Sequence, residues 1–141
     1  GGYNHLKPMI DELRSARIRV SLFIEADPKA IDTAAKLGAD IVELHTGTYC
    51  EKALEGDEAG LARELARLRE GARRAAAAGL EVHAGHGLTF DTVGPIAALP
   101  EIVELNIGHF LVGEAIFVGF EQAIREMRRL MDAARAGGAA K

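Results

Sequence analysis

The spacing of hydrophobic positions changes several times along the chain, and each change marks a new element. In residues 1–17 the apolar side chains lie three and four positions apart, which predicts an amphipathic N-terminal helix. Residues 18–26 are rich in β-branched and aromatic side chains over a stretch too short for a typical helix, so they predict a buried strand. Asp27 before a proline and Gly38 supply the usual signals for the start and end of a helix, which we place at residues 28–37.

The same alternation of strand and helix continues to the end of the chain. Further strands are predicted at residues 39–46, 80–85 and 101–107, and further helices at residues 57–79, 91–99 and 114–135. Residues 136–141 are expected to be a frayed tail. Strands that alternate with helices imply a parallel sheet with right-handed crossovers, so we expect residues 1–141 to form a single α/β unit of four strand–helix repeats.

An internal repeat indicates a barrel. Residues 41–47 and 102–108 both read Ile-Val-Glu-Leu with a glycine at the same offset, two strand–helix units apart. A TIM (β/α)8 barrel is built from such units and usually takes about 250 residues. The chain has four of the eight strands, so it predicts half of a barrel, which cannot close as a lone monomer.

An open sheet covered by helices on both faces is the alternative, and the polar side chains argue against it. One face of the predicted strands is apolar, whereas the other carries Ser21, Phe23, Glu25, Glu43, His45, His83, Glu104 and Asn106. Burying such carboxylates and imidazoles against apolar helices would cost about several kcal/mol for each unpaired charge. A polar barrel lumen accommodates them better.

Histidines beside glycines mark the ends of three predicted strands. These are His45, His86 and His109. Imidazole passes protons near neutral pH, and neighbouring glycines let backbone N–H groups approach a ligand closely. The segment that starts at Gly108 also leads from the last strand into a helix, where many barrels bind phosphate, provided that Glu114 points away. The pattern predicts an acid–base and phosphate-binding rim.

Each candidate also has a purely structural interpretation. Glu43 fits equally well as a carboxylate paired with a nearby arginine or lysine. His45 and His83 lie within strands and fit better as hydrogen-bonding groups of the lumen than as catalysts. His86, between two glycines, favours a functional role, whereas His109 fits ligand contact and loop capping alike.

Neither a metal site nor a cysteine nucleophile is predicted. Histidines at strand ends can converge on zinc, and the candidates here are His45, His83, His86 and His109. No His-x-His pair lies at a strand end, so no metal is predicted. Cys50 falls in a predicted loop without a base nearby, and we interpret it as a spare thiol.

Composition narrows the class of protein further. The chain has 141 residues, 17 Lys plus Arg against 21 Asp plus Glu and a formal charge of -4, so no basic surplus exists for nucleic acid or an anionic membrane. No apolar stretch approaches the roughly 20 residues that cross a bilayer. The single cysteine cannot close an internal disulfide, and the N-terminus has no signal-peptide pattern. These features predict a cytoplasmic protein.

Four segments together resemble the pyridoxine 5'-phosphate synthase family. They read VSLFIEAD at residues 20–27, ELHTG at residues 43–47, AGHGLT at residues 84–89 and ELNIGH at residues 104–109. AGHGLT followed by ELNIGH is the most specific part. The match runs in order from about residue 10 to residue 135 and covers the C-terminal half of the family's barrel.

The resemblance implies a transferase of vitamin B6 biosynthesis that needs no cofactor. Such an enzyme condenses 1-deoxy-D-xylulose 5-phosphate with 3-amino-2-oxopropyl phosphate and releases phosphate and water. By motif, His86 is similar to the family's general acid and Glu43 to the group that stabilises the transition state. Gly87, Gly108 and His109 are similar to the residues that hold the aminoketone phosphate.

The chain departs from the family in two respects. His83 stands where the family has asparagine, and the N-terminal half, with a further histidine and glutamate and the residues that bind the sugar phosphate, is not in this sequence. We therefore expect a piece of a longer, homo-oligomeric enzyme that is inactive without its other half. The alternatives are another phosphate-binding barrel enzyme, less well an aldolase because no lysine lies at a strand end, or a non-catalytic half-barrel module.

Overall fold

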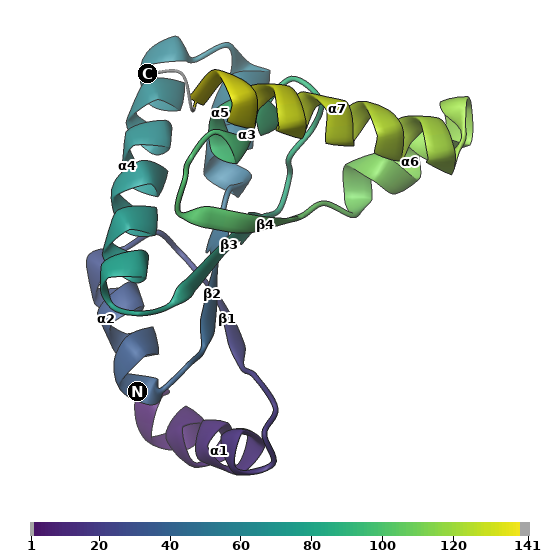
Figure 1. The fold of residues 1–141 in the computed structure, drawn as a ribbon. Helices are drawn as coiled ribbons and strands as arrows, with labels where there is room; N and C mark the ends of the chain where they lie inside the picture. Colours follow the sequence, from purple (N-terminus) through teal and green to yellow (C-terminus); the bar gives the residue numbers. More distant parts are fainter. Residues whose placement is uncertain (1, 139–141) are drawn as a thin grey trace.

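A four-stranded parallel sheet organises the chain in the computed structural model, which describes residues 2–138 (Figure 1). The strands, in spatial as well as chain order, are β1 (Ser21–Ile24), β2 (Ile41–His45), β3 (Glu81–Gly85) and β4 (Ile102–Asn106). Each strand is added on the same side of the one before it, as in the wall of a (β/α)8 barrel. A doubly wound sheet would reverse its direction of addition. The predicted four parallel strand–helix units of a half-barrel are confirmed.

The connecting helices follow the strands in sequence. They are α1 (Tyr3–Ser15), α2 (Pro28–Leu37), α3 (Gly47–Glu55), α4 (Glu58–Ala77), α5 (Val93–Ala97), α6 (His109–Val118) and α7 (Phe120–Gly138). The carboxylate of Asp27 accepts hydrogen bonds from the backbone N–H groups of Lys29 and Ala30, both at 3.0 Å, and so begins α2 as predicted. Gly38, at φ 83°, ends it.

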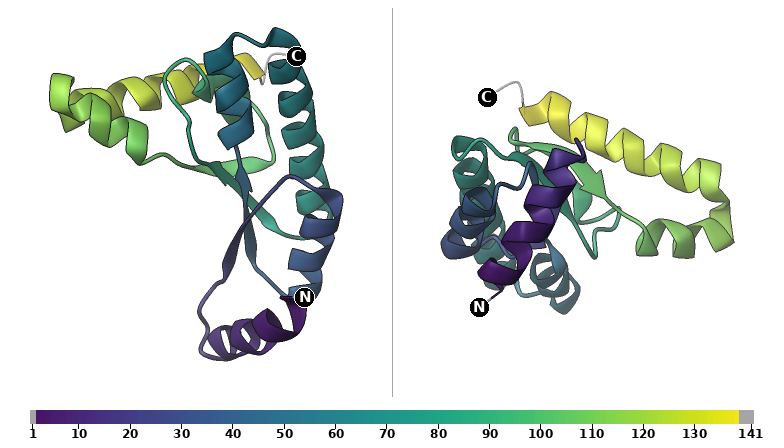
Figure 2. Two further views of the ribbon diagram at one scale, coloured as in Figure 1. Left: turned by 180° about the vertical axis from the view of Figure 1, so that it is seen from behind. Right: turned by 90° about the horizontal axis from the view of Figure 1, so that it is seen from below.

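The two faces of the sheet differ as the alternation of the sequence predicts. Helices α2 and α4 cover one face, and the core between them contains the fully buried Val42, Leu44 and Leu68 (Figure 2). The opposite face stays open, and Phe23 on it is 55% exposed. His83 is the buried exception because its imidazole lies between two carboxylates of its own face, those of Glu81 at 2.8 Å and Glu104 at 3.4 Å.

Two predictions for helices were wrong. Residues 47–55 form α3, where the sequence analysis predicted a loop around Cys50. The helix predicted at residues 114–135 begins already at His109 and is broken at Gly119, whose φ of 84° and ψ of 149° only glycine adopts readily. The frayed tail expected at residues 136–141 stays a prediction, because α7 extends to Gly138 and residues 139–141 lie outside the described residues.

Helices α6 and α7 extend away from the sheet as an arm (Figure 1). Helix α6 has no buried residue, and large apolar side chains are exposed on it and on the start of α7: Val112, Ile116, Phe117, Phe120 and Ile124. Fixed apolar surface of this kind normally packs against another element or another subunit. Within the described residues, these five side chains stay exposed, although α7 itself packs against α5.

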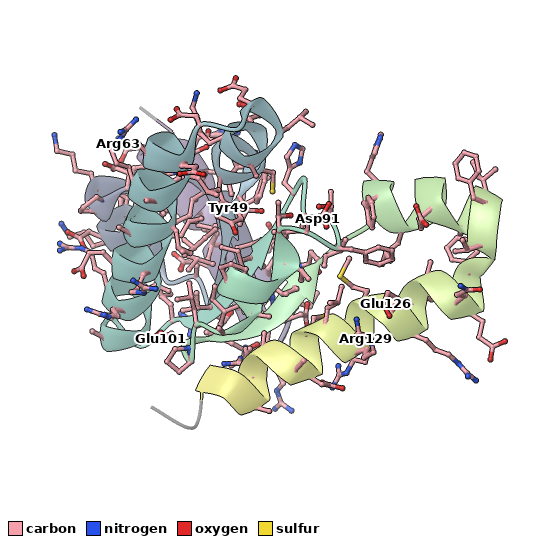
Figure 3. The ribbon with its side chains drawn as sticks, turned by 90° about the horizontal axis from the view of Figure 1, so that it is seen from above. Tyr49, Arg63, Asp91, Glu101, Glu126 and Arg129 are labelled. Carbon is pink, nitrogen blue, oxygen red and sulfur yellow. The ribbon has the colours of Figure 1, made fainter. Side chains whose placement is uncertain are left out.

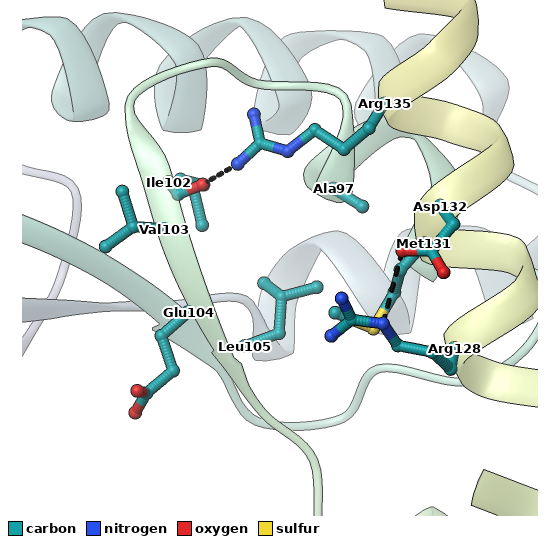
Figure 4. Close-up of a pocket in the computed structure, with 9 residues that line it drawn as sticks. All are labelled: Ala97, Ile102, Val103, Glu104, Leu105, Arg128, Met131, Asp132 and Arg135. Atoms are coloured by element: carbon teal, nitrogen blue, oxygen red, sulfur yellow. Dashed lines mark hydrogen bonds and ion pairs between the residues drawn. The ribbon is translucent and has the colours of Figure 1, made fainter. Parts of the chain in front are cut away.

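Arg135 anchors the far end of α7 to the sheet. Its guanidinium donates to the backbone carbonyls of Leu99, at 2.9 Å, and of Ile102, where β4 begins (Figure 4). One and two turns earlier on α7, Asp132 and Arg128 form an ion pair at 3.2 Å beside a small cavity of about 110 Å³. The contacts of Arg135 fix the base of the arm at β4.

None of the helices between residues 2 and 138 combines the length and the apolar composition that crossing a bilayer requires.

The ion pair between α2 and α4 predicts a loss of stability in acid. Two hydrogen bonds from Arg74 to Asp32, at 2.8 and 2.6 Å, hold the pKa of the Asp32 carboxyl below its ordinary value. A carboxyl group whose pKa is lower in the folded than in the unfolded state contributes its full stabilisation at a pH above the unfolded-state pKa. This stabilisation is lost as the pH falls through the folded-state pKa. We expect the urea concentration at the midpoint of unfolding to decrease as the pH is lowered below about 4. This decrease should be less steep in the Arg74→Gln variant. The control is Arg69→Gln, exposed on the same helix, and identical pH curves for the two variants would contradict the prediction.

Candidate functional site

A pocket of about 820 Å³ lies at the carboxyl ends of β2, β3 and β4, on the open face of the sheet. All five residues singled out from the sequence line it: Glu43, His86, Gly87, Gly108 and His109. The parallel strands explain the convergence, because their carboxyl ends meet at the same edge of the sheet. Phe23, Asn106 and Phe110, to which the sequence analysis gave no chemical role, also line it.

Glu43 projects from β2 over the neighbouring strand. One carboxylate oxygen accepts a hydrogen bond from the Asn106 side-chain amide at 2.9 Å, and the other lies directly above Gly85. Within residues 2–138 its partner is therefore an amide, and not the arginine or lysine of the structural interpretation. An amide holds the carboxylate in place without cancelling its negative charge, so the charge stays available to a cationic group in the pocket.

His86 lies in the turn that follows β3. Its φ of 82° is in the left-handed region that few side-chain-bearing residues adopt, and Gly87 continues this conformation at φ 81°. The turn points the exposed imidazole out of the sheet edge instead of into the core. Non-glycine residues in this conformation persist where surrounding contacts hold them and cluster at functional sites.

Thr46 supports the His86 turn through hydrogen bonds, and the sequence analysis gave this residue no role. It is fully buried, and its hydroxyl lies 2.7 Å from the carbonyl oxygen of Gly85 and 2.6 Å from that of His86. Its backbone N–H also donates to the Gly85 oxygen, at 2.9 Å. The only signal in the sequence is a small hydroxyl residue at the end of a strand, which ordinarily indicates a helix cap.

Replacement of Thr46 by valine should loosen the turn. Valine has the same shape but removes the hydroxyl donor that the carbonyls of Gly85 and His86 share, which costs about 1–2 kcal/mol of unfolding free energy. Thr46→Ser keeps the hydroxyl and should recover much of the loss. Urea unfolding of the two variants and the parent chain measures this difference, and equal stability of the valine and serine variants would contradict it.

Cys50 lies on α3 and not in the loop that the sequence predicted. It is partly buried, and its thiol lies 3.8 Å from the carbonyl oxygen of His86 and 3.9 Å from the hydroxyl of Thr92. Burial raises the pKa of the Cys50 thiol, which disfavours the nucleophilic thiolate. These surroundings suit a packing role against the His86 turn.

Tyr49, the residue before it, is enclosed in the interior (Figure 3). Its hydroxyl donates to the carbonyl of Thr92 at 3.1 Å, and burial raises the pKa of Tyr49 to about 12. It is therefore neutral at physiological pH and ties α3 to the segment before α5.

The far wall of the pocket is formed where β4 passes into α6. Gly108 precedes the helix and His109 opens it, so the backbone N–H groups of the first turn lie at the pocket edge. That turn contains no acidic residue, and Glu114 is not among the residues that line the pocket. Phe110 packs edge-on against Phe90, with the ring centroids 4.7 Å apart, and stabilises this wall.

The two other histidines of the sheet face lie toward its opposite ends. The His45 ring lies 4.7 Å from that of His86, behind the pocket, whereas His83 is bound by Glu81 at the opposite end of β3. Both are hydrogen-bonded within the lumen face, as the sequence analysis favoured. Within residues 2–138, no three His, Cys, Asp or Glu side chains are placed to hold a metal ion together.

Consecutive parallel strands with a pocket at their carboxyl ends define part of a (β/α)8-barrel protein. Comparison with known proteins is more specific, because residues 1–133 match the family model described as pyridoxal phosphate biosynthesis protein PdxJ. The chain belongs to this family.

Curated relatives agree with this assignment. Three of them are proteins named pyridoxine 5'-phosphate synthase. The protein from Roseobacter denitrificans is 62% identical over 94% of this chain, that from Jannaschia sp. 59% over 96%, and that from Rhodospirillum rubrum 61% over 99%. The matched regions make up 53%, 54% and 55% of those proteins. The chain thus spans about half the length of the curated relatives that it matches.

Proposed function

We propose that this chain provides the C-terminal half of the active site of a pyridoxine 5'-phosphate synthase. The reaction would be the condensation of 1-deoxy-D-xylulose 5-phosphate with 3-amino-2-oxopropyl phosphate to pyridoxine 5'-phosphate, without a cofactor. The observation that carries the proposal is that Glu43, His86, Gly87, Gly108 and His109 line one pocket at the carboxyl ends of the strands. Its volume of about 820 Å³ suits small phosphorylated substrates.

His86 and Glu43 would perform the proton transfer and charge stabilisation. The exposed imidazole of His86 can donate a proton to a leaving oxygen, since imidazole exchanges protons near neutral pH. The carboxylate of Glu43, held by Asn106 but not neutralised, would stabilise positive charge that develops on the aminoketone nitrogen.

Gly87, Gly108 and His109 would hold the phosphate of the aminoketone. Backbone N–H groups at the start of α6 carry partial positive charge, and glycine permits close approach of an anion. His86, as the general acid, and the phosphate-binding groups would then act on the same bound molecule.

The other half of the site would come from strands that pair with the free edges of β1 and β4. In the described residues each of these strands has one neighbour only, and an open edge favours pairing with further strands. The exposed apolar arm of α6 and α7 supports packing against that half or against another copy in a homo-oligomer. We place this assembly in the cytoplasm.

A completed barrel tests the proposal. We define it as this chain fused behind the N-terminal half of the Roseobacter denitrificans relative, and the intact relative serves as the positive control. We expect the completed barrel to form product and release phosphate from the two substrates, and this chain alone to form none. A completed barrel that unfolds cooperatively but makes no product would overturn the proposal, as would full activity of the chain alone.

A further inference from the structure

Behind the pocket, two polar contacts lead from α4 to the His45 ring, which packs against the ring of His86. Arg67 on α4 lies 3.1 Å from one carboxylate oxygen of Glu25, and the other oxygen of Glu25 lies 2.7 Å from Nδ1 of His45. An ionised carboxylate can only accept, so Nδ1 carries the proton of this hydrogen bond. Glu25 therefore fixes both the tautomer and the rotation of the His45 ring.

The His45 ring is packed between the groups that surround the His86 turn. Its centroid lies 4.7 Å from that of His86, with a 48° angle between the planes, and 5.1 Å from that of Phe23, edge-on. A methyl group at Gly47 would lie 2.7 Å from Cε1 and Nε2 of His45 and 3.2 Å from Cδ2 of His86. Both imidazoles therefore lie close to the same glycine, so the position of one ring limits the position of the other.

His86 needs such support because its backbone alone does not orient its ring. The turn is held by Thr46 through the carbonyl oxygen, but among the described residues no hydrogen bond reaches the His86 imidazole, which is exposed. Its ring contacts are with His45 and, at 6.2 Å between centroids, with Phe23. Proton transfer is sensitive to such orientation, since a displacement of about 1 Å can cost as much as a hundredfold in rate.

We propose that His45, held by Glu25, is a positioning residue that orients the His86 imidazole for proton transfer. This inference rests on the proposed function for the role of His86. His45 does not line the pocket, and its Nε2 edge lies against Gly47. It therefore acts through His86 and does not touch the substrate.

Replacement of Glu25 tests the proposal in the completed barrel. Glu25→Ala frees the His45 ring, and we expect kcat to fall about tenfold with KM changed less than about twofold. Glu25→Gln keeps an oxygen that accepts from Nδ1 and should recover most of the loss. The matched control is Glu70→Ala on α4, which removes a carboxylate that is 73% exposed and that pairs with Arg73 and not with Arg67.

A spectroscopic measurement on this 141-residue chain separates positioning from general destabilisation. With ¹³C-labelled histidine, we expect Glu25→Ala to shift and broaden the ring signals of His86 and to leave those of His109 unchanged. A second variant, His45→Asn, keeps a donor toward Glu25 but removes the ring, and it should give the same changes if Glu25→Ala does not fold.

The proposal requires both the fall in kcat and the change at His86. It is wrong if the Glu25→Ala barrel behaves like Glu70→Ala, if KM rises with kcat unchanged, or if either effect occurs without the other. If the unaltered completed barrel makes no product, the proposed function fails instead, and the His86 signals alone decide whether Glu25 and His45 order that ring.

Discussion

Replacement of His86 by asparagine is expected to lower the kcat of the completed barrel by about 10²- to 10⁴-fold, the usual contribution of a general acid. Asparagine is chosen because it tolerates left-handed backbone better than most residues, and the φ at this position is 82°. The turn that Thr46 and Gly87 support should therefore keep its shape while the imidazole is lost. Steady-state phosphate release, with the thermal midpoint recorded alongside, measures the effect.

The control for this variant is the same substitution at His5, which lies exposed on α1 and away from the pocket. His5→Asn should leave kcat and the thermal midpoint close to those of the parent. A His86→Asn barrel that keeps more than about a third of the parental kcat would contradict the role of His86 as general acid. So would a loss of activity fully accounted for by unfolding.

The sequence predicted the sheet well because its strands and their boundaries carry local signals. Val42 and Leu44 alternate with Glu43 and His45, and this period of two places the first pair in the core and the second pair on the open face. Helix α2 was placed correctly because Asp27 caps it and Gly38 ends it. Each of these features acts within a few residues of the position that it specifies.

Two helices could not be placed because their stability is not local. Helix α3 begins after Thr46, whose hydroxyl bonds the His86 turn and makes no cap hydrogen bond to the helix itself. The helix depends instead on the burial of Tyr49 in the core. Helix α6 is apolar on all sides, so residues 109–118 show no helical period in their polar positions.

In the site, too, features that depend on local sequence were predictable and contacts that depend on tertiary structure were not. The strand ends and neighbouring glycines predicted which residues gather, because parallel strands bring their carboxyl ends together. The partner of Glu43 was not predictable, since Asn106 lies 63 positions away and the contact depends on the register of β2, β3 and β4. The contact of Glu25 with His45 depends in the same way on tertiary structure.

The strongest effect on the sheet itself is expected from Gly85→Ala. A methyl group here would lie 2.5 Å from a carboxylate oxygen of Glu43 and 2.7 Å from the backbone carbonyl oxygen of Asn106. The carboxylate can move aside, but the carbonyl belongs to β4, which is paired with β3 at this position, so the two strands must separate. We expect a loss of about 1–3 kcal/mol of unfolding free energy, and at least about a hundredfold loss of kcat/KM because Glu43 leaves its hydrogen bond with Asn106.

Gly94→Ala is the matched control for this substitution. Gly94 lies in α5, and apart from its chain neighbours nothing is within 4 Å of an added methyl group. The preference of helices for alanine is offset by Pro95, which disfavours helical backbone at the residue before it. Urea unfolding should therefore show Gly94→Ala close to the parental stability, with Gly85→Ala well below it. If Gly85→Ala matched the control in both stability and activity, Glu43 would not lie over β3, and the charge stabilisation proposed for it would lose its structural basis.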